Sequence, residues 1–221
     1  MGNFQAKDKV LEIEHSSQRR RVGILGGTFD PIHYGHLVIA EEVRVALDLT
    51  EVLFIPASQP PHKLSHHITP VYHRVAMLEL ALVSNPHFFY SCIEIERNGP
   101  SYTADTLQTL RERWGSETDI DFIIGWDSLE ELHTWHDAPR LLSALTHLVA
   151  VRRPGYEDDA EYNNTLETRL PGILQRLLIV PAPQLDISAT ELRERVASGK
   201  PIKYQTPEPV EAYIKKNKLY L

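Results

Sequence analysis

A glycine- and histidine-rich stretch near the start of the chain reads Gly26-Gly27-Thr28-Phe29-Asp30-Pro31-Ile32-His33-Tyr34-Gly35-His36-Leu37. It follows the apolar run at residues 22–25, which has the length and composition of a buried strand. A strand, a glycine turn and a helix in this order are typical of one unit of a parallel α/β sheet. We therefore expect a helix from about Gly35, and its apolar positions are Leu37, Ala40, Val43 and Leu47.

Strand-length apolar runs and helix-length amphipathic segments keep alternating along the rest of the chain. This alternation predicts an α/β fold, a Rossmann-like and doubly wound parallel sheet with helical elements at its C-terminal end. The further predicted strands are residues 52–55, 88–96, 121–124, 147–151 and 177–180.

Capping residues mark the beginnings of several predicted helices. Thr69 and Pro70 are predicted as the N-cap and the first helical residue of one of them. Ser188 and Glu191 have the spacing of a capping box and predict another helix after Ser188. Helices are also predicted around residues 104–114, in a short stretch that ends at Leu142, and over residues 208–216.

Composition narrows the class of protein. The chain has 221 residues, of which 42% are hydrophobic, enough for a sizeable core. Residues 1–20 show no sustained periodicity, so we expect a flexible arm before a single domain over residues 21–221. No apolar run approaches the roughly 20 residues of a membrane span, and the charged N-terminal stretch is unlike a signal peptide. Cys92 is the one cysteine, so a cytoplasmic protein is expected, and the net charge of −7 argues against a general nucleic-acid binder.

The glycine- and histidine-rich stretch is expected at the carboxyl end of a strand, where parallel α/β sheets bind ligands. Its glycines allow close approach, and the following helix N-terminus offers N–H groups to a phosphate. His33 and His36 are three residues apart, so both rings could face one side and donate hydrogen bonds to phosphate oxygens. The residues alone leave open a zinc pair or surface histidines, although no third zinc ligand is evident nearby. The stretch matches neither a Walker A loop nor a G-x-G-x-x-G fingerprint.

The stretch also resembles the signature of the nucleotidylyltransferase superfamily, whose H-x-G-H motif is matched by residues 33–36. Together with four further segments it resembles the bacterial nicotinate-nucleotide adenylyltransferases, from about residue 22 to the C-terminus. The first motif is typical of the whole superfamily, whereas the ordered set is specific. The four segments read Pro60-Pro61-His62-Lys63, Ser101-Tyr102-Thr103-Ala104-Asp105-Thr106-Leu107, Ile124-Gly125-Trp126-Asp127 and Ile187-Ser188-Ala189-Thr190-Glu191-Leu192-Arg193.

This resemblance implies transfer of the adenylyl group of ATP to nicotinate mononucleotide in NAD biosynthesis, with Mg²⁺ as cofactor and pyrophosphate as by-product. The nucleophile is then a phosphate monoester with a second pKa of about 6, which is mostly dianionic at neutral pH and needs no general base. The barrier lies in bringing two anions together. Such a reaction calls for positioning and electrostatic stabilisation rather than covalent catalysis.

The resemblance also implies roles for single residues around ATP. His33, His36 and Arg193 are the predicted catalytic residues: the histidines hold the phosphates, His36 nearest the α-phosphate, and Arg193 neutralises the β- and γ-phosphates. The whole predicted ATP-binding set is Gly26, Gly27, Thr28, Phe29, His33, His36, Gly125, Asp127, Ile187, Ser188, Thr190 and Arg193.

For nicotinate mononucleotide the resemblance implies four residues, Lys63, Tyr102, Thr103 and Trp135. An indole face suits a positively charged pyridinium ring. The ordinary alternatives are a core tryptophan and a solvated loop lysine. Arg152 and Arg153 could meet a phosphate or carry plain surface charge. No protein-bound metal site, membrane or nucleic-acid partner is predicted, and formation of a homo-oligomer is left open.

Two positions depart from the family pattern. Ala189 stands where a second serine is common, and Trp126 is bulkier than the usual residue.

Three alternative functions remain. One is another nucleotidylyltransferase, such as phosphopantetheine adenylyltransferase, which tends to be shorter with Thr at the position of His33. Another is a preference for the amidated mononucleotide. The last is a catalytically silent nucleotide-binding regulator, which would not need His33, His36 and Arg193 together.

Overall fold

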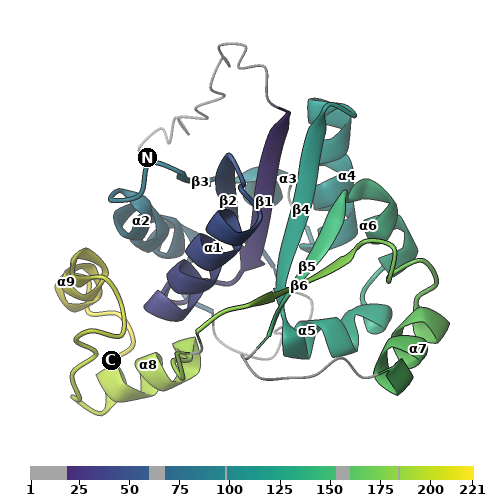
Figure 1. Ribbon diagram of the computed structural model, residues 1–221. Coiled ribbons are helices and arrows are strands. Elements are labelled where there is room, and N and C mark those ends of the chain that lie inside the picture. Colours follow the sequence, from purple (N-terminus) through teal and green to yellow (C-terminus); the bar gives the residue numbers. More distant parts are fainter. Residues whose placement is uncertain (1–18, 60–67, 98, 153–159, 184) are drawn as a thin grey trace.

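The computed structural model describes residues 19–59, 68–97, 99–152, 160–183 and 185–221, and within them a sheet of parallel strands forms the centre (Figure 1). The strand order is β3-β2-β1-β4-β5-β6, and every neighbouring pair is parallel. This confirms the predicted α/β fold with a doubly wound sheet. The strands are β1 (Arg20–Gly27), β2 (Glu51–Pro56), β3 (Phe88–Tyr90), β4 (Thr118–Gly125), β5 (His147–Arg152) and β6 (Leu177–Pro181).

The order of the strands creates a switch point between β1 and β4. The chain runs outward from β1 through β2 to β3 and then returns to the other side of β1 as β4. Leu25 of β1 is paired with Ile123 of β4, so both strands end at neighbouring glycines, Gly27 and Gly125. In open α/β sheets a ligand binds outside the carboxyl ends of the strands at such a point.

Helices cover both faces of the sheet (Figure 1). Neighbouring residues of β4 belong to different cores: Phe122 and Ile124 pack in one apolar cluster, Ile123 in the other. A strand buried on both sides reads as a continuous apolar run, which explains why it was recognisable in the sequence. The first cluster includes residues of α4 (Thr103–Trp114) and α6 (Ala138–Ala144), and the second includes residues of α1 (Tyr34–Ala46), α2 (Val71–Leu82), α8 (Ala189–Ala197) and α9 (Glu208–Lys216).

The predicted strand over residues 88–96 is wrong beyond its first three residues. β3 ends at Tyr90, and the short helix α3 (Ile93–Arg97) follows. The side chain of Ser91 accepts a hydrogen bond from the N–H of Ile93 at 3.3 Å, which helps to turn the chain. Ile93 and Glu94 are both buried although they are adjacent, so the alternation that a half-buried strand needs is absent.

Two predicted helix ends also differ from the structure. The N-cap of α2 is Pro70 rather than Thr69, and the helix begins at Val71. The backbone of Thr69 makes hydrogen bonds with side chains instead. Its N–H donates to the carboxylate of Asp30, and its carbonyl accepts from the guanidinium of Arg74. At the end of α1 the helix stops at Ala46, so the predicted helical position Leu47 is its C-cap. Ser188 is confirmed as the N-cap of α8, and its hydroxyl accepts from the N–H of Glu191 at 3.1 Å.

Residues 126–144 form three short elements instead of the single predicted helical stretch. They are α5 (Trp126–Glu131), the 3₁₀ helix η2 (Leu132–Thr134) and α6, which Asp137 caps through its side chain. The helix α7 (Ala160–Arg169) was not predicted, because its sequence is polar and buries only Leu166. Of the predicted arm over residues 1–20, residues 1–18 lie outside the described residues, as do the loop residues 60–67, whereas Arg20 already belongs to β1.

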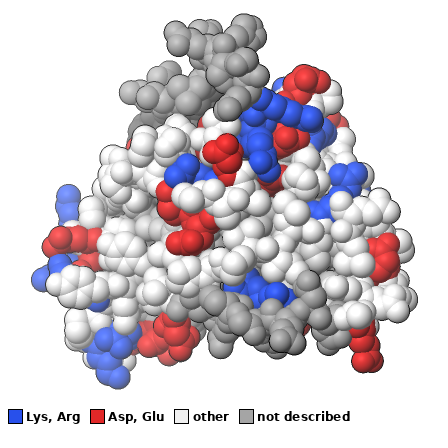
Figure 2. Space-filling model, in the orientation of Figure 1, with Lys and Arg blue, Asp and Glu red and all other residues white. Residues whose placement is uncertain are grey.

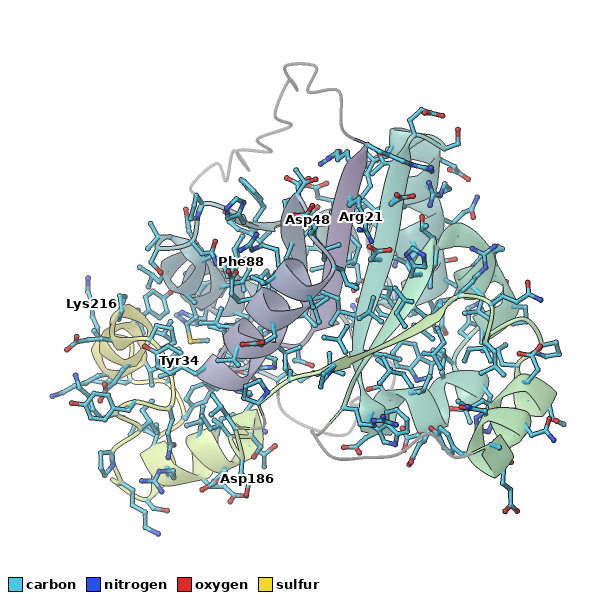
Figure 3. The ribbon with its side chains drawn as sticks, in the orientation of Figure 1. Arg21, Tyr34, Asp48, Phe88, Asp186 and Lys216 are labelled. Carbon is cyan, nitrogen blue, oxygen red and sulfur yellow. The ribbon has the colours of Figure 1, made fainter. Side chains whose placement is uncertain are left out.

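One group of charged residues lies at the amino ends of the strands. Figure 2 shows Lys and Arg side chains gathered at the top of the molecule, over the start of β1. They are paired with acids, Arg19 with Asp119 at 3.1 Å and Arg21 with Asp121 at 3.3 Å. Figure 3 shows Arg21 at this end and Tyr34, the first residue of α1, at the opposite end. Among the described residues, none of the helices has the length and apolarity to cross a membrane.

Candidate active site

A cavity of about 670 Å³ opens at the carboxyl ends of β1 and β4. It lies at the switch point of the sheet, where the fold itself favours a ligand. Two groups of lining residues face it. The glycine wall consists of Gly26, Gly27, Thr28 and His36, and the aromatic wall consists of Tyr102, Thr103, Trp135 and His136.

The cavity brings together eight residues that the sequence assigned to two different ligands. The predicted ATP-binding residues that line the cavity are Gly26, Gly27, Thr28, His36 and Gly125, and the predicted acceptor-binding residues are Tyr102, Thr103 and Trp135. Gly125 has nothing within 4 Å of the position that a Cβ would take, so a ligand can approach its backbone closely.

The two histidines of the glycine-rich stretch are stacked at the start of α1. His33 is the N-cap residue, and its N–H donates to Nδ1 of His36 at 3.3 Å. The ring centroids are 3.7 Å apart. A Cβ on Gly35 would lie 3.0 Å from the His33 ring, so a larger residue at this position would require the ring to shift. Because Nδ1 of His36 accepts, Nε2 is its proton-carrying nitrogen, and His36 lines the cavity.

His33 contributes in a different way from His36. It is 6% exposed and does not line the cavity. Burial lowers the pKa of His33 from 6.5 to about 4, so this imidazole is neutral at physiological pH. Its Nδ1 is buried without a hydrogen-bond partner among the described residues. The predicted pair therefore consists of a cavity-facing ring backed by a neutral buried one.

The loop between β1 and α1 is held from behind by a buried network. Arg74 of α2 donates to the carbonyl oxygens of Thr28 at 2.8 Å and Thr69 at 3.0 Å. The carboxylate of Asp30 accepts from the hydroxyl of Tyr220 at 2.7 Å and from the N–H of Thr69 at 3.1 Å. Burial and the nearby Asp30 raise the pKa of Tyr220, which keeps this hydroxyl protonated as a donor. The backbone that faces the cavity is therefore fixed by partners from distant elements.

Arg193 of α8 reaches this loop from the C-terminal part of the chain. One guanidinium nitrogen donates to the carbonyl of Asp30 at 2.8 Å, and another lies 3.2 Å from the hydroxyl of Thr190. The carbonyl of Ile187 lies 3.7 Å from the position of a Cβ on Gly35. The N-terminal ends of α1 and α8 are thus neighbours, and each presents the positive end of a helix dipole.

The aromatic wall combines two elements that follow different strands. Tyr102 is the N-cap of α4, and its ring stacks on that of His136 with centroids 4.1 Å apart. Trp135 follows η2 and meets Phe122 of β4 edge to face, with centroids 6.3 Å apart. Trp135 is partly exposed and lines the cavity, so it is not simply a core tryptophan.

Some predicted residues do not line the cavity. Phe29 is 1% exposed and packs in the core against His36, with ring centroids 5.1 Å apart. Asp127, Ser188 and Thr190 are exposed on the N-terminal turns of α5 and α8. The predicted residues Lys63 and Arg153 lie outside the described residues.

The two departures from the family pattern have different outcomes. Trp126 does not line the cavity, because its ring stacks on Tyr162 of α7 at 5.2 Å. Arg152 also contacts Trp126, because its guanidinium carbon lies over the ring, 5.2 Å from the centroid. Ala189 is the first residue of α8, after the Ser188 cap, and the cap is intact without a second hydroxyl.

Five polar residues that line the cavity were missed: Glu94, Ser101, Ser128, Thr134 and His136. Ser101 belongs to a quoted motif, and His136 follows Trp135 directly, so their sequence neighbourhood was a usable signal. Glu94 was hidden inside the wrongly predicted strand.

Comparison with known proteins identifies the family of this chain. The family model described as cytidylyltransferase-like matches residues 24–195. A curated relative from Roseiflexus sp. (strain RS-1), named "Probable nicotinate-nucleotide adenylyltransferase", is 52% identical over 90% of this chain and 97% of its own length. This chain belongs to the nicotinate-nucleotide adenylyltransferase family. A second relative of the same name, from Thermomicrobium roseum, is 48% identical over 90% of this chain and 91% of its own.

Solved structures share the fold of this family member. One is described as nicotinic acid mononucleotide adenylyltransferase of Plasmodium falciparum complexed with NaAD. It has a TM-score of 0.71 and 20% sequence identity, and the match covers 91% of this chain and 97% of that one. At this identity the likeness supports the Rossmann-like architecture.

Proposed function

We propose that this protein transfers the adenylyl group of ATP to nicotinate mononucleotide, giving nicotinate adenine dinucleotide and pyrophosphate for NAD biosynthesis. The observation that carries the proposal is the cavity at the switch point, because it joins the glycine wall and the aromatic wall in one space. The glycine wall suits phosphates, and the aromatic wall suits a flat cationic ring. The names of the curated relatives point to the same reaction.

The reaction needs little proton chemistry from the protein. An oxygen of the acceptor's 5′-phosphate attacks the α-phosphorus of ATP, and the bond from that phosphorus to the bridging oxygen breaks. Pyrophosphate leaves with the electron pair. Because the attacking phosphate has a pKa of about 6, it is already ionised at neutral pH. The protein then has to align the two phosphates and stabilise the charge that moves onto the leaving group.

His36 and Arg193 are the groups that we assign to this stabilisation. In this proposal, Nε2 of His36 donates a hydrogen bond from the glycine wall to a phosphate oxygen of ATP. Nδ1 of His36 is kept as an acceptor by the N–H of His33. Arg193 supplies the positive charge, and its contact with the carbonyl of Asp30 aims it at the same loop. His33 acts as a neutral residue that orients His36, because burial keeps its pKa at about 4.

The divalent ion is best regarded as part of the ATP substrate. Among the described residues, no group of three or more His, Cys, Asp or Glu side chains could hold a metal ion. The part of the chain that the structure describes therefore offers no cluster that fits a protein-bound metal. We propose that Mg²⁺ enters on the phosphates of ATP, as an ion that takes oxygen ligands and keeps several waters.

For the acceptor, we propose that the pyridinium ring lies against Trp135 and that Tyr102 and Thr103 line its other side. The N-terminal N–H groups of α4 suit the carboxylate of nicotinate, since a helix N-terminus favours an anion. Asp127, Ser188, Thr190 and Lys63 remain proposed contacts of the ribose and phosphates. A cytoplasmic location and a single catalytic domain from residue 21 onward remain proposals from composition.

The test is an assay of the purified full chain with ATP, Mg²⁺ and one acceptor at a time, with pyrophosphate release as the readout. Nicotinate mononucleotide should give a kcat/KM at least about tenfold above nicotinamide mononucleotide, a difference of about 1.4 kcal/mol. A higher value for nicotinamide mononucleotide would assign the amidated acceptor, and equal values would contradict the expected preference for nicotinate mononucleotide. Absence of release with either acceptor would favour the nucleotide-binding regulator.

A further inference from the structure

Glu94 is a buried carboxyl group on the cavity that the proposed reaction does not use. It lies on α3, is 8% exposed and contributes to the lining of the cavity. A buried carboxyl group is costly unless hydrogen-bond donors surround it. Here the hydroxyl of Thr106 donates to its Oε1 at 2.8 Å, and Ser101 makes a second side-chain hydrogen bond to it.

Ser101 connects this carboxyl group to the loop that follows β2. Its Oγ accepts hydrogen bonds from the N–H groups of Ser58 at 2.8 Å and Gln59 at 3.2 Å. With its lone pairs used by two N–H donors, the hydroxyl hydrogen is directed to Glu94. The backbone continues the connection, because the N–H of Ser101 donates to the carbonyl of Gln59 at 3.1 Å.

The same cluster holds the first turn of α4. Thr106 lies 3.3 Å from the carbonyl of Tyr102, and Arg97 lies 3.2 Å from the Thr106 hydroxyl and 3.4 Å from the Tyr102 carbonyl. Tyr102 and Thr103 face the cavity from this turn. One carboxyl group therefore joins three segments, α3, the start of α4 and the loop after β2.

We propose that Glu94 is a positioning residue that, as a carboxylate, holds the Ser101–Thr103 turn in the geometry that binds the acceptor nucleotide. The inference rests on the proposed function, because it takes Tyr102 and Thr103 as acceptor contacts. A carboxylate can accept from both hydroxyls, whereas a protonated or amidated side chain offers a donor of its own and displaces one of them. The turn then loses its connection either to α4 or to the loop after β2.

Titration of Glu94 gives a readout that a purely structural role would lack. Burial raises the pKa of Glu94, while the hydrogen bonds from Thr106 and Ser101 and the charge of Arg97 oppose the rise. The carboxylate network is thus complete at higher pH and is lost as the pH falls through the raised pKa. Other ionisable groups on the same cavity are His36 and His136, and the acceptor phosphate itself titrates at a pKa of about 6.

The experiment compares Glu94→Gln with Glu96→Gln, a control that removes an exposed carboxylate from the same helix. Glu94→Gln should raise KM for nicotinate mononucleotide by about tenfold, the loss of roughly one good hydrogen bond. KM for ATP and kcat should stay within about twofold, and Glu96→Gln should match the wild type. Ser101→Ala should reproduce the acceptor-specific effect and serves as a second probe if Glu94→Gln is poorly folded.

The ratio of acceptor KM values, Glu94→Gln over wild type, is then measured against pH. Titration of the substrate, His36 and His136 cancels in this ratio, which should fall toward one at low pH because protonated Glu94 resembles glutamine. A ratio that does not change with pH, or an acceptor KM that is unchanged in both Glu94→Gln and Ser101→Ala, would overturn the inference. Failure of the wild type to use any acceptor would instead reject the proposed function.

Discussion

The glycine wall and the aromatic wall of the cavity are built in different ways. The glycine wall is a loop whose shape depends on partners far away in the sequence, Arg74, Arg193 and Tyr220. The Tyr102–Thr103 part of the aromatic wall is held mainly by neighbouring segments, because Glu94, Ser101 and Tyr102 lie close together in the chain. Damage to the first wall should therefore affect catalysis and folding together, whereas damage to the second should be confined to the acceptor.

The largest effect is expected for His36→Ala in the glycine wall. Loss of the Nε2 donor at the α-phosphate should lower kcat by about a hundredfold, or roughly 3 kcal/mol. Steady-state kinetics with both substrates saturating measures this directly, and thermal unfolding controls for the fold. An unchanged kcat in a folded variant would remove His36 from the mechanism.

Arg193→Ala comes next, because it removes the cation that we assign to the leaving pyrophosphate. We expect kcat/KM for ATP to fall by about thirtyfold, near 2 kcal/mol, with a smaller change in acceptor KM. Arg195 lies on the same helix and donates to the carbonyl of Pro201 at 3.0 Å, so Arg195→Ala is the matched control. Equal losses in the two variants would mean that only the stability of α8 had been measured.

Trp135→Ala tests the aromatic wall. Removal of the ring should raise KM for nicotinate mononucleotide by about tenfold, within the range of a desolvated cation–π contact. KM for ATP should remain near its wild-type value, and Trp135→Phe should recover part of the loss. If KM rises equally for both substrates, the two walls do not act separately.

Tyr220→Phe should have a smaller effect that is divided between stability and ATP binding. It leaves one oxygen of Asp30 without its 2.7 Å donor but keeps the ring in place. We expect a loss of about 1 kcal/mol in the free energy of unfolding. Denaturant unfolding measures the stability, and a shift in KM for the acceptor rather than for ATP would contradict the coupling of Tyr220 to the glycine wall.

The smallest effect is a pH dependence of stability that comes from His33. In the unfolded chain this histidine binds a proton near pH 6.5, but in the folded protein only at about pH 4. Stability should therefore fall as the pH decreases through this window, by about 1 kcal/mol between roughly pH 7.5 and 5.5. His33→Gln should remove this part of the pH dependence, which urea titrations at the two pH values can measure in the free enzyme.

Local patterns predicted the parts of the site that depend on local geometry. The spacing of His33 and His36 and the cap at Ser188 each lie within a few residues, and the structure brings both helix starts together. The contact between Tyr220 and Asp30 spans 190 residues, and no pattern of hydrophobic residues along the sequence could predict it.

Glu94 was missed for a different reason. The apolar residues Ile93 and Ile95 flank it with strand-like alternation, but tertiary packing selects a short helix after β3. Glu94 therefore fell inside the predicted strand over residues 88–96, although its carboxyl group is buried on the cavity. The surroundings of the aromatic wall were therefore less predictable from the sequence than the glycine wall.

The reach of Arg193 from α8 back to Asp30 has a thermodynamic consequence for the bound state. A nucleotide that engages both the loop and the guanidinium acts as a further cross-link between two parts of the chain that are far apart in the sequence. Its binding free energy is added to the local stability of α8 by mass action. Amide hydrogen exchange in α8 should slow when ATP is present, while exchange in α6, on the other face of the sheet, should change little.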